Sequence, residues 1–281
     1  MKEYGFSVIG GDTRLVCLAD LLCRDGHYVK TFLSDHSEKE NTQPVIRCFD
    51  AETALNATDI CLLGMPCSKD GTHLFAPGAK SSFPLEFLFE YLPGKLLFAG
   101  KFPVGIPTPC PVFDYAEDPV LLEKNAILTA EGALKILSEE LPVPIRNAEC
   151  ALTGYGRIAR ALAHLLQKNG ANVTIFARSE KARKQAKDAG FSAFPISLLG
   201  EKISGFSALI NTVPAPIIRP EALQMACAAL FCMELASPPG GFTDPPPRLY
   251  KAAGVPGKFA PDRAAAVILE AIYKKLEEHY V

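Results

Sequence analysis

The sequence has no run of about 18 consecutive apolar residues, the length that a helix needs to cross a bilayer. It also has little net charge, because 29 basic and 31 acidic residues leave −2 at pH 7. Nothing in that balance favours nucleic acid or an anionic membrane as a partner. Met1–Gly5 is mostly polar and runs straight into an apolar stretch at Phe6–Ile9, which predicts no signal peptide. We therefore expect a cytoplasmic protein.

The usual cysteine patterns of disulfides and metal sites are missing as well. The nine cysteines are odd in number, and no two of them form a CxxC pair. Most of them lie in apolar runs, where a thiol behaves as a small hydrophobic side chain: Cys17, Cys23, Cys61, Cys150, Cys227 and Cys232. We expect no metal site and a reducing compartment.

The 281 residues, 48% of them hydrophobic, are enough for two α/β domains. In the first 120 residues short apolar runs alternate with helical patterns, which predicts a doubly wound parallel sheet. A helix is expected after Arg14 and another at Pro84–Tyr91. The expected strands are Phe6–Ile9, Tyr28–Leu33, Val45–Phe49, Asp59–Leu63, Lys95–Ala99 and Val112–Tyr115.

The turn after the first expected strand reads G-G-D-T-R, from Gly10 to Arg14. Such a turn lies at the carboxyl edge of a parallel sheet, where ligands bind, and Arg14 is suited to hold a carboxylate through two parallel hydrogen bonds. The alternative is a tight turn with a solvated arginine. Lys69 and His73, in the long loop Gly64–Ser82, are further candidates to face a cleft.

Asn125–Glu139 has its apolar residues on one helical face, and two prolines after it end the pattern. We expect this helix to lead from the first domain to the second. Thr129 and Glu131 are polar within it, so they are candidates to face a groove between the domains. An ordinary exposed helix side explains them equally well.

Cys150–Arg160 carries the pattern G-x-G-x-x-A, in which a strand enters a helix whose N-terminus holds a pyrophosphate. Gly154 permits the tight turn, Gly156 lets the backbone approach the phosphates, and Ala159 lets the helix pack close to its strand. The amide groups and dipole at the helix N-terminus favour an anion. Five residues of this turn are predicted to bind the cofactor: Gly154, Tyr155, Gly156, Arg157 and Ile158.

The next expected strand, Asn172–Ala177, is followed by Arg178 and Ser179. An NAD-binding domain usually has a carboxylate here, roughly 20 residues after the fingerprint, to bind the ribose 2′-hydroxyl. An arginine can instead pair with a 2′-phosphate, and a serine can add a hydrogen bond. Lys181 and Arg183 follow closely, although alone they fit a solvated helix surface. The sequence therefore favours NADP over NAD.

Two further strand ends indicate where the nicotinamide would lie. A buried strand at Phe206–Asn211 ends in Thr212, Val213 and Pro214, and the proline keeps this exit extended. A strand at Leu230–Glu234 is followed by Leu235, Ala236, Ser237 and a Pro-Gly turn. A last short strand is expected at Val255–Ala260, and Asp262 is expected to cap a final helix that ends near Tyr280.

These patterns predict two doubly wound domains linked by two helices. The first domain would comprise residues 1–120, completed by the C-terminal helix 262–281. The linking helix and the cofactor domain would comprise residues 121–261.

Seven segments resemble the A subunit of dipicolinate synthase from spore-forming bacteria, and they run in order over nearly the whole chain. They are V-I-G-G-D-T-R (8–14), N-A-I-L-T-A-E-G (125–132), T-G-Y-G-R-I-A-R (153–160), A-R-S (177–179), I-N-T-V-P (210–214), L-A-S-P-P-G-G (235–241) and G-V-P-G-K-F-A-P (254–261). The glycine turn and I-N-T-V-P are common to many dehydrogenases, whereas the first, second and last two are more specific together. Leu128 stands where the family's pattern has a proline.

The resemblance implies a flavodoxin-like N-terminal domain and a Rossmann domain that binds NADP. It also implies oxidation of dihydrodipicolinate to dipicolinate during sporulation, in the cytoplasm of the mother cell, together with the flavodoxin-like B subunit of dipicolinate synthase. Candidate residues for this cyclic dicarboxylate are Arg14, Thr129, Glu131, Ser237 and Lys258, with Arg263 beside Lys258 as an option. No residue is assigned to accept the proton, because aromatisation of the ring makes only a modest demand on a base.

Other readings stay open at this point. A 2-hydroxyacid dehydrogenase needs a histidine as acid–base, and none of the five histidines lies in the loop before the last helix. A shikimate-type enzyme uses Lys and Asp, of which Pro66-Cys67-Ser68-Lys69 is a loose echo. The third alternative is a scaffold or regulatory protein that binds NADP without transferring hydride, and homo-oligomers are compatible with all of them.

Overall fold

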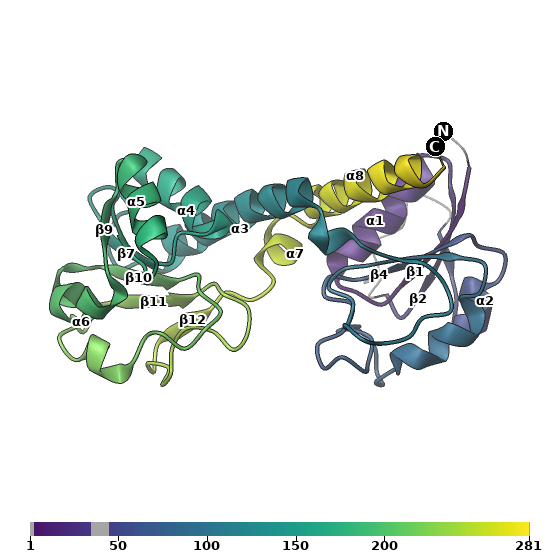
Figure 1. The fold of residues 1–281 in the computed structure, drawn as a ribbon, viewed down its shortest axis with the longest axis horizontal. Helices are drawn as coiled ribbons and strands as arrows, with labels where there is room; N and C mark the ends of the chain where they lie inside the picture. The colour runs from purple at the N-terminus through teal and green to yellow at the C-terminus, as the bar shows by residue number, and fades with distance from the viewer. Residues whose placement is uncertain (1–2, 35–44, 281) are drawn as a thin grey trace. The chain divides into compact units, whose positions relative to one another are not determined.

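The computed structural model describes residues 3–34 and 45–280. The chain forms two compact units: Met1–Asn125 with Ala260–Val281 make the first unit, and Ala126–Phe259 make the second. It passes from the first unit to the second within helix α3 (Pro119–Glu140). It returns between α7 (Val255–Phe259) and α8 (Pro261–Tyr280) (Figure 1).

The first unit contains a sheet of six parallel strands in the order β3-β2-β1-β4-β5-β6. Without the two-residue edge strand β3, this is the 2-1-3-4-5 order of flavodoxin-like sheets. The predicted fold class is confirmed for this unit. The strands are β1 (Gly5–Ile9), β2 (Tyr28–Phe32), β3 (Ile46–Arg47), β4 (Ile60–Leu63), β5 (Leu96–Ala99) and β6 (Val112–Asp114).

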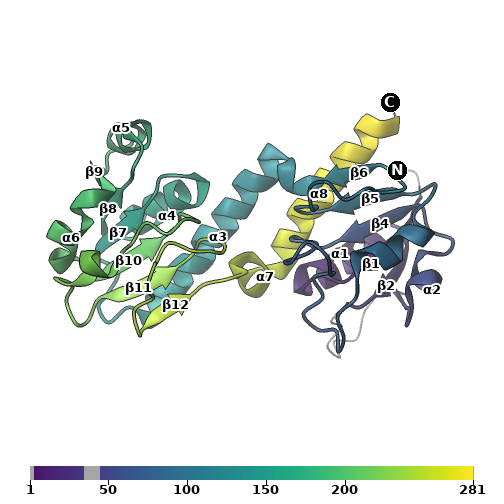
Figure 2. The ribbon, with the colours of Figure 1, turned by 60° about the horizontal axis from the view of Figure 1, so that its bottom comes forward.

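Helical segments cover both faces of this sheet (Figure 2). Alternate residues of one strand point to opposite faces, so Phe6 and Val8 join one apolar cluster while Ile9 joins the other. Helices α1 (Thr13–Arg24) and α8 pack on the first face. On the other face lie α2 (Ala51–Leu55) and η1 (Leu85–Tyr91), a 3₁₀ helix at the place of the helix expected at Pro84–Tyr91.

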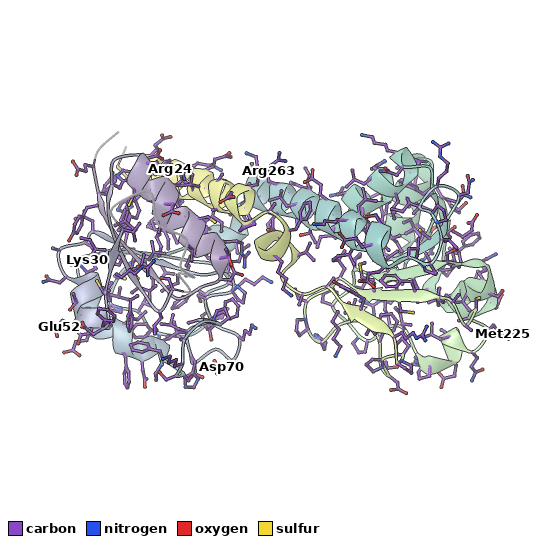
Figure 3. The ribbon with its side chains drawn as sticks, turned by 180° about the vertical axis from the view of Figure 1, so that it is seen from behind. Arg24, Lys30, Glu52, Asp70, Met225 and Arg263 are labelled. Atoms are coloured by element: carbon purple, nitrogen blue, oxygen red, sulfur yellow. The ribbon has the colours of Figure 1, made fainter. Side chains whose placement is uncertain are left out.

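A buried cation links the sheet to α2. The side chain of Lys30, on β2, donates hydrogen bonds of 2.8 Å to the carbonyls of Thr53 and Asn56. These carbonyls belong to the C-terminal end of α2, which carries partial negative charge and therefore compensates the ammonium. Figure 3 labels Lys30, which lies on β2, and Glu52, which lies on α2.

The C-terminal helix α8 belongs to the core of the first unit. Its buried residues recur at helical spacing and contact the cluster that α1 completes: Ala265, Ile268, Leu269, Ile272 and Leu276. Lys274 also pairs with Asp118 at 2.8 Å, at the start of α3.

Replacing Ile272 by alanine is expected to lower the free energy of unfolding by about 2–4 kcal/mol, because its side chain is fully buried and would leave a cavity. Chemical denaturation measures the loss. Ile127→Ala is the matched control, since Ile127 lies on α3 with 49% of its surface exposed. The Ile127→Ala substitution is expected to cost about 0.5 kcal/mol. Equal losses in the two variants would show that α8 does not contribute to this core.

A second contact of α8 predicts a pH dependence. The backbone N–H of Tyr4 donates to His27 Nδ1 at 3.3 Å, so the neutral ring carries its proton on Nε2, 3.1 Å from the Tyr273 hydroxyl. Tyr273 in turn donates to Asp25 at 2.7 Å. Burial lowers the pKa of His27, and the charges of Asp25 and Glu3 only partly oppose it.

The unfolded chain therefore takes up a proton at His27 near its ordinary pKa of about 6.5, before the folded chain does. This contribution to stability is complete above that pH and is lost as the pH falls through the lower folded pKa. Urea unfolding from about pH 8 to about pH 5 measures it against His27→Gln, which cannot titrate. Parallel curves for the two proteins would contradict the assignment.

The second unit contains six parallel strands in the order β12-β11-β10-β7-β8-β9. Counted within the unit this is 3-2-1-4-5-6, the order of dinucleotide-binding Rossmann sheets, so the predicted fold class is confirmed here too. Helices α3 and α4 (Arg157–Lys168) pack on one face. The strands are β7 (Glu149–Thr153), β8 (Asn172–Phe176), β9 (Ser192–Phe194), β10 (Ala208–Asn211), β11 (Phe231–Glu234) and β12 (Leu249–Lys251).

The remaining helices of this unit, besides α7, are short. They are α5 (Glu180–Asp188), α6 (Leu199–Lys202) and the 3₁₀ turns η3 (Ile196–Leu198), η4 (Ile203–Gly205) and η5 (Pro220–Leu223). Residues of α6, η4 and η5 contact the apolar cluster on the second face of the sheet. Another 3₁₀ turn, η2 (Tyr115–Glu117), follows β6 in the first unit.

The strand predicted at Val255–Ala260 is wrong: Val255–Phe259 is helix α7, and the last strand is β12. Pro256 lies in the first turn of α7, where its missing N–H costs no hydrogen bond. A Cβ on Gly132 would lie 2.3 Å from Val255 Cγ1, so α3 and α7 pack closely at this glycine. Two of the segments that carry the family resemblance thus contact each other within the second unit.

Two helix starts also differ from prediction. Helix α3 begins at Pro119 and continues without interruption through Leu128, where no proline interferes. Asp262 lies inside the first turn of α8 instead of capping it. A carboxylate there still stabilises the helix through its dipole.

Candidate functional site

The glycine turn lies between β7 and α4. Gly154 has φ +82°, its N–H donates to the Phe176 carbonyl at 2.8 Å, and a Cβ on it would lie 2.6 Å from Val213 Cγ2. Both the dihedral and the contact require glycine at this position.

At position 156, glycine has a different role from that of Gly154. Its φ of −82° suits any residue, yet nothing lies within 4 Å of the position where a Cβ would stand. It is the N-cap of α4 and makes no side-chain cap, so the space where a capping side chain would stand is open. Ala159, one turn on, is fully buried against the sheet. This arrangement of open space at the positive end of a helix dipole, with no side-chain cap, fits the pyrophosphate of a dinucleotide.

The loop after β8 contains Arg178 and Ser179, both exposed. Ser179 caps α5, because its hydroxyl accepts a hydrogen bond from the Ala182 N–H at 3.4 Å. Arg183 Nη1 donates to the carbonyls of Ala177 at 2.9 Å and Arg178 at 2.6 Å. The sequence allowed a solvated Arg183, but its side chain fixes the backbone that presents Arg178.

The exit from β10 is tied to the glycine turn. Thr212 Oγ1 donates to the Thr153 carbonyl at 2.7 Å, directly before Gly154. The amide of Asn211 holds Val213 from both sides: Oδ1 accepts from the Val213 N–H at 3.1 Å, and Nδ2 donates to the Val213 carbonyl at 2.9 Å. Pro214, the next residue, is exposed.

The exit from β11 begins with buried Leu235, whose N–H donates to the Asn211 carbonyl at 2.9 Å. Ala236 follows half-buried, and Ser237 is exposed. The predicted cofactor residues thus occur at the carboxyl ends of four neighbouring strands, β8, β7, β10 and β11, which is the edge where parallel α/β sheets bind ligands.

Sequence reasoning missed Glu234 and the role of Asn211. Asn211 is fully buried at the end of β10, and Glu234 at the end of β11 is half-buried, with 2.6 Å between Asn211 Nδ2 and Glu234 Oε1. The available signal was a polar residue that closes each of two apolar strand runs, A-L-I-N and F-C-M-E.

Arg14 of the first unit is already bound within its own turn. It donates to Asp12 at 2.8 Å through both Nε and Nη2, and Nη2 also reaches the Met65 carbonyl at 2.5 Å. Burial by itself would lower the Arg14 pKa, but the hydrogen bonds and the charge of Asp12 raise it above its ordinary value. A substrate carboxylate at Arg14 would compete with Asp12, and this role stays a prediction.

The other candidate substrate residues lie in the second unit. Thr129 is buried and Glu131 half-buried on α3, whereas Ser237 and Lys258 are exposed on the β11 loop and α7. Arg263 is exposed near the start of α8 in the first unit, and Figure 3 labels it. Their roles stay predictions as well.

Two residues of the long loop 64–82 make local contacts. Lys69 Nζ lies 4.4 Å from the centroid of the Phe75 ring. His73 Nδ1 lies 2.8 Å from Asp70, whose pKa is held well below its usual range by hydrogen bonds from the His73 and Thr72 N–H groups. Asp70 therefore shapes this turn as an ionised carboxylate.

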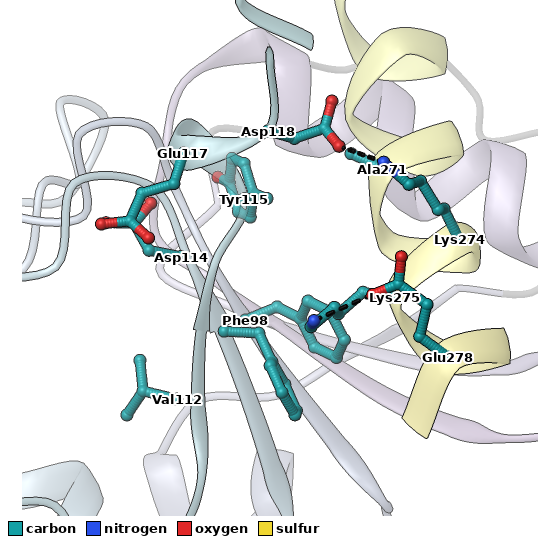
Figure 4. A pocket seen from close by; sticks show the side chains of 11 residues that line it. Phe98, Val112, Asp114, Tyr115, Glu117, Asp118, Ala271, Lys274, Lys275 and Glu278 are labelled. Carbon is teal, nitrogen blue, oxygen red and sulfur yellow. Dashed lines mark hydrogen bonds and ion pairs between the residues drawn. The ribbon is translucent and has the colours of Figure 1, made fainter. Parts of the chain in front are cut away.

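A cavity of about 420 Å³ lies between β6 and α8 of the first unit (Figure 4). Four of its charged side chains pair with each other, Lys274 with Asp118 at 2.8 Å and Lys275 with Glu278 at 2.9 Å. None of the predicted site residues lines it. The cavity is lined by Phe98, Val112, Phe113, Asp114, Tyr115, Glu117, Asp118, Ala271, Lys274, Lys275 and Glu278.

Within residues 3–34 and 45–280, no group of three or more His, Cys, Asp or Glu residues is arranged to hold a metal ion. Across that same part of the chain, no helix has the length and apolar composition to span a membrane.

Residues 5–105 match the family model of the N-terminal domain of the dipicolinate synthase A subunit. The A subunit of dipicolinate synthase from Bacillus subtilis is 29% identical over 160 residues, which cover 55% of this chain and 54% of the relative. The alignment therefore spans about half the length of this relative.

Solved structures extend the likeness to both units. The crystal structure of the dipicolinate synthase A subunit from Bacillus halodurans has a TM-score of 0.80 at 22% identity and covers 97% of both chains. The corresponding dipicolinate synthase structure from Bacillus subtilis has a TM-score of 0.78 at 21% identity, covering 99% of this chain and 97% of its own. A transhydrogenase from Sinorhizobium meliloti has a TM-score of 0.66 at 15% identity, with 98% and 93% covered. At these identities the structures establish the fold, and the predicted resemblance to the dipicolinate synthase A subunit is confirmed, by the family model over residues 5–105 and by the fold over both units.

Proposed function

We propose that this chain is the component of a dipicolinate synthase that oxidises dihydrodipicolinate to dipicolinate with NADP as hydride acceptor. The observation that carries the proposal is the open, uncapped N-terminus of α4 at Gly156, flanked by four strand ends of a Rossmann sheet. The choice of dihydrodipicolinate as the proposed substrate comes from the family resemblance.

The proposed cofactor would bind along the carboxyl edge of the second sheet. The glycine turn (154–158) would hold the pyrophosphate, and Arg178 and Ser179 would hold the 2′-phosphate. Residues 212–214, Leu235 and Ala236 would face the nicotinamide ribose and ring. NADP is favoured over NAD because an exposed arginine occupies the place of the usual carboxylate, on a backbone that Arg183 holds.

The nicotinamide ring supplies the chemistry of hydride acceptance when the cofactor is bound. Loss of a hydride and a proton from the dihydropyridine ring leaves an aromatic pyridine, so the protein mainly has to orient the ring and hold its carboxylates. Arg14, Thr129, Glu131, Ser237 and Lys258 remain the candidates for that task. Arg14 would have to exchange one hydrogen bond to Asp12 for a hydrogen bond to a substrate carboxylate. Both acceptors are carboxylates, so the guanidinium would keep a negatively charged partner.

The proposed partner is the flavodoxin-like B subunit of dipicolinate synthase, in the mother-cell cytoplasm of a sporulating bacterium. The name of the Bacillus subtilis relative, one lettered subunit of a synthase, supports the existence of such a partner. A homo-oligomer is compatible with this arrangement.

The test adds dihydrodipicolinate and NADP⁺ to the purified chain, with and without the B subunit, and follows reduced cofactor and dipicolinate by absorbance. Turnover in either mixture is the expected result. Binding of NADP without turnover in both mixtures would favour the alternative of a non-catalytic scaffold or regulatory protein. Turnover of a 2-hydroxyacid or a shikimate-type substrate instead would replace the proposed substrate.

A further inference from the structure

The carboxylate of Glu234 joins the end of β10 to the loop that follows β11. Its Oε1 accepts hydrogen bonds from Asn211 Nδ2 at 2.6 Å and from the Ala236 N–H at 3.0 Å. Its Oε2 accepts from the Gly241 N–H at 2.7 Å. Glu234 thereby ties the end of β10 to both ends of the loop that follows β11.

The backbone around this carboxylate leaves no room for larger residues. Gly240 has φ +82°, and a Cβ there would lie 2.8 Å from Glu234 Oε2. A Cβ on Gly241 would lie 2.4 Å from the amide group of Asn211. The glycine pair of L-A-S-P-P-G-G therefore lets this loop close over Glu234 and Asn211.

Asn211 links Glu234 by hydrogen bonds to Val213, in the loop that follows β10. Its Oδ1 accepts from Thr153 Oγ1 and the Val213 N–H, and its Nδ2 donates to Glu234 and the Val213 carbonyl. All four hydrogen-bonding positions of the amide are filled, and the acceptor-only carboxylate of Glu234 fixes which end of the amide is the NH₂. Val213, held at both its N–H and its carbonyl, then packs 2.6 Å from the Cβ position of Gly154.

We propose that Glu234 is a positioning residue for the nicotinamide half of the cofactor. It acts through Asn211 on Val213 and directly on Ala236, the two exits that the proposed function assigns to the nicotinamide. The inference rests on that proposed function. The adenine half depends on other contacts, since Gly154 is held by β8 through Phe176 and Arg178 is held by Arg183.

Glutamine cannot take the place of this carboxylate. Three N–H groups converge on the two oxygens of Glu234, and Glu234→Gln would turn an NH₂ group toward at least one of these donors. The exits of β10 and β11 would then lose their fixed geometry while the side-chain volume stays the same.

The test compares two ligands on the full chain. NADPH occupies both halves of the proposed site, whereas adenosine 2′,5′-bisphosphate occupies only the adenine half. The chain has no tryptophan, so the fluorescence of the reduced nicotinamide can be titrated without interference from indole, and calorimetry measures the bisphosphate. Glu234→Gln is expected to weaken the binding of NADPH by about tenfold or more. It is expected to change the affinity for the bisphosphate by less than about twofold.

Gly241→Ala perturbs the same hydrogen-bond network at the amide of Asn211, against which its new Cβ would press. It is expected to weaken NADPH binding selectively, as Glu234→Gln does. Glu201→Gln is the matched control, because Glu201 is an exposed residue of α6. It should leave the affinities for both ligands unchanged. Thermal unfolding of each variant reports its folding.

The proposal is overturned if Glu234→Gln and Gly241→Ala bind NADPH like the wild type. It is also overturned if both ligands weaken equally, because that is the result of a merely structural residue. A wild-type chain that binds neither ligand removes the proposed function itself, and this inference falls with it.

Discussion

Gly156→Asp is expected to weaken NADP(H) binding by about 30- to 100-fold without unfolding the protein. The φ of −82° at Gly156 accepts any residue and its Cβ position is open, so the substitution strains nothing. The new carboxylate would occupy the place of the phosphates and satisfy the first-turn N–H groups itself, as an N-cap. Loss of those hydrogen bonds together with charge repulsion corresponds to about 2–3 kcal/mol.

The measurement is cofactor titration alongside thermal unfolding. Gly205→Asp is the matched control, because Gly205 is also exposed in the second unit with nothing within 4 Å of its Cβ position. The control should bind the cofactor normally. Gly156→Asp is expected to keep or raise the melting temperature, since aspartate caps a helix better than glycine does. Unchanged affinity in Gly156→Asp would remove the α4 N-terminus as the phosphate site.

Arg178→Ala is expected to weaken NADP(H) binding by about 10- to 100-fold and to leave NAD(H) binding nearly unchanged, because only the 2′-phosphate would lose a charged hydrogen bond. Arg178 is exposed, so its loss should cost little stability. Titration with both cofactors measures the ratio of their dissociation constants.

Lys187→Ala is the control for this variant, since it removes a positive charge from the last turn of α5 at an exposed position. It should change both affinities by a small factor that salt suppresses. An equal loss of NADP and NAD affinity in Arg178→Ala would indicate a general electrostatic effect, and an unchanged ratio would contradict the preference for NADP.

Local patterns in the sequence predicted most strands of the two sheets, but not β9 and β12, the edge strands of the second sheet. Parallel strands alternate with helical segments, and alternate strand residues face the two apolar clusters, as in β1 and β4. The one strand predicted wrongly, at Val255–Ala260, is short, and an apolar run of that length fits either a strand or a helix. Its contact with Gly132 on α3 decides for α7, and that contact joins residues far apart in the chain.

Polar partners were harder to predict, as Arg14 illustrates. Its spacing after two glycines indicates a ligand-binding arginine, but the fold supplies Asp12 and the Met65 carbonyl as partners before any ligand arrives. For Arg183 the sequence predicted too little: its position fits a solvated helix surface. In the structure its side chain donates hydrogen bonds to the carbonyls of Ala177 and Arg178 at the end of β8.

The sequence by itself determined the parallel α/β class, the glycine turn and the basic residue after β8, because each depends on the chemistry of neighbouring residues. Only the tertiary structure decided that Glu234 meets Asn211, a residue 23 positions away, and that both constrain Val213 beside Gly154. The register of parallel strands sets which polar ends meet, and that register comes from packing across the whole sheet.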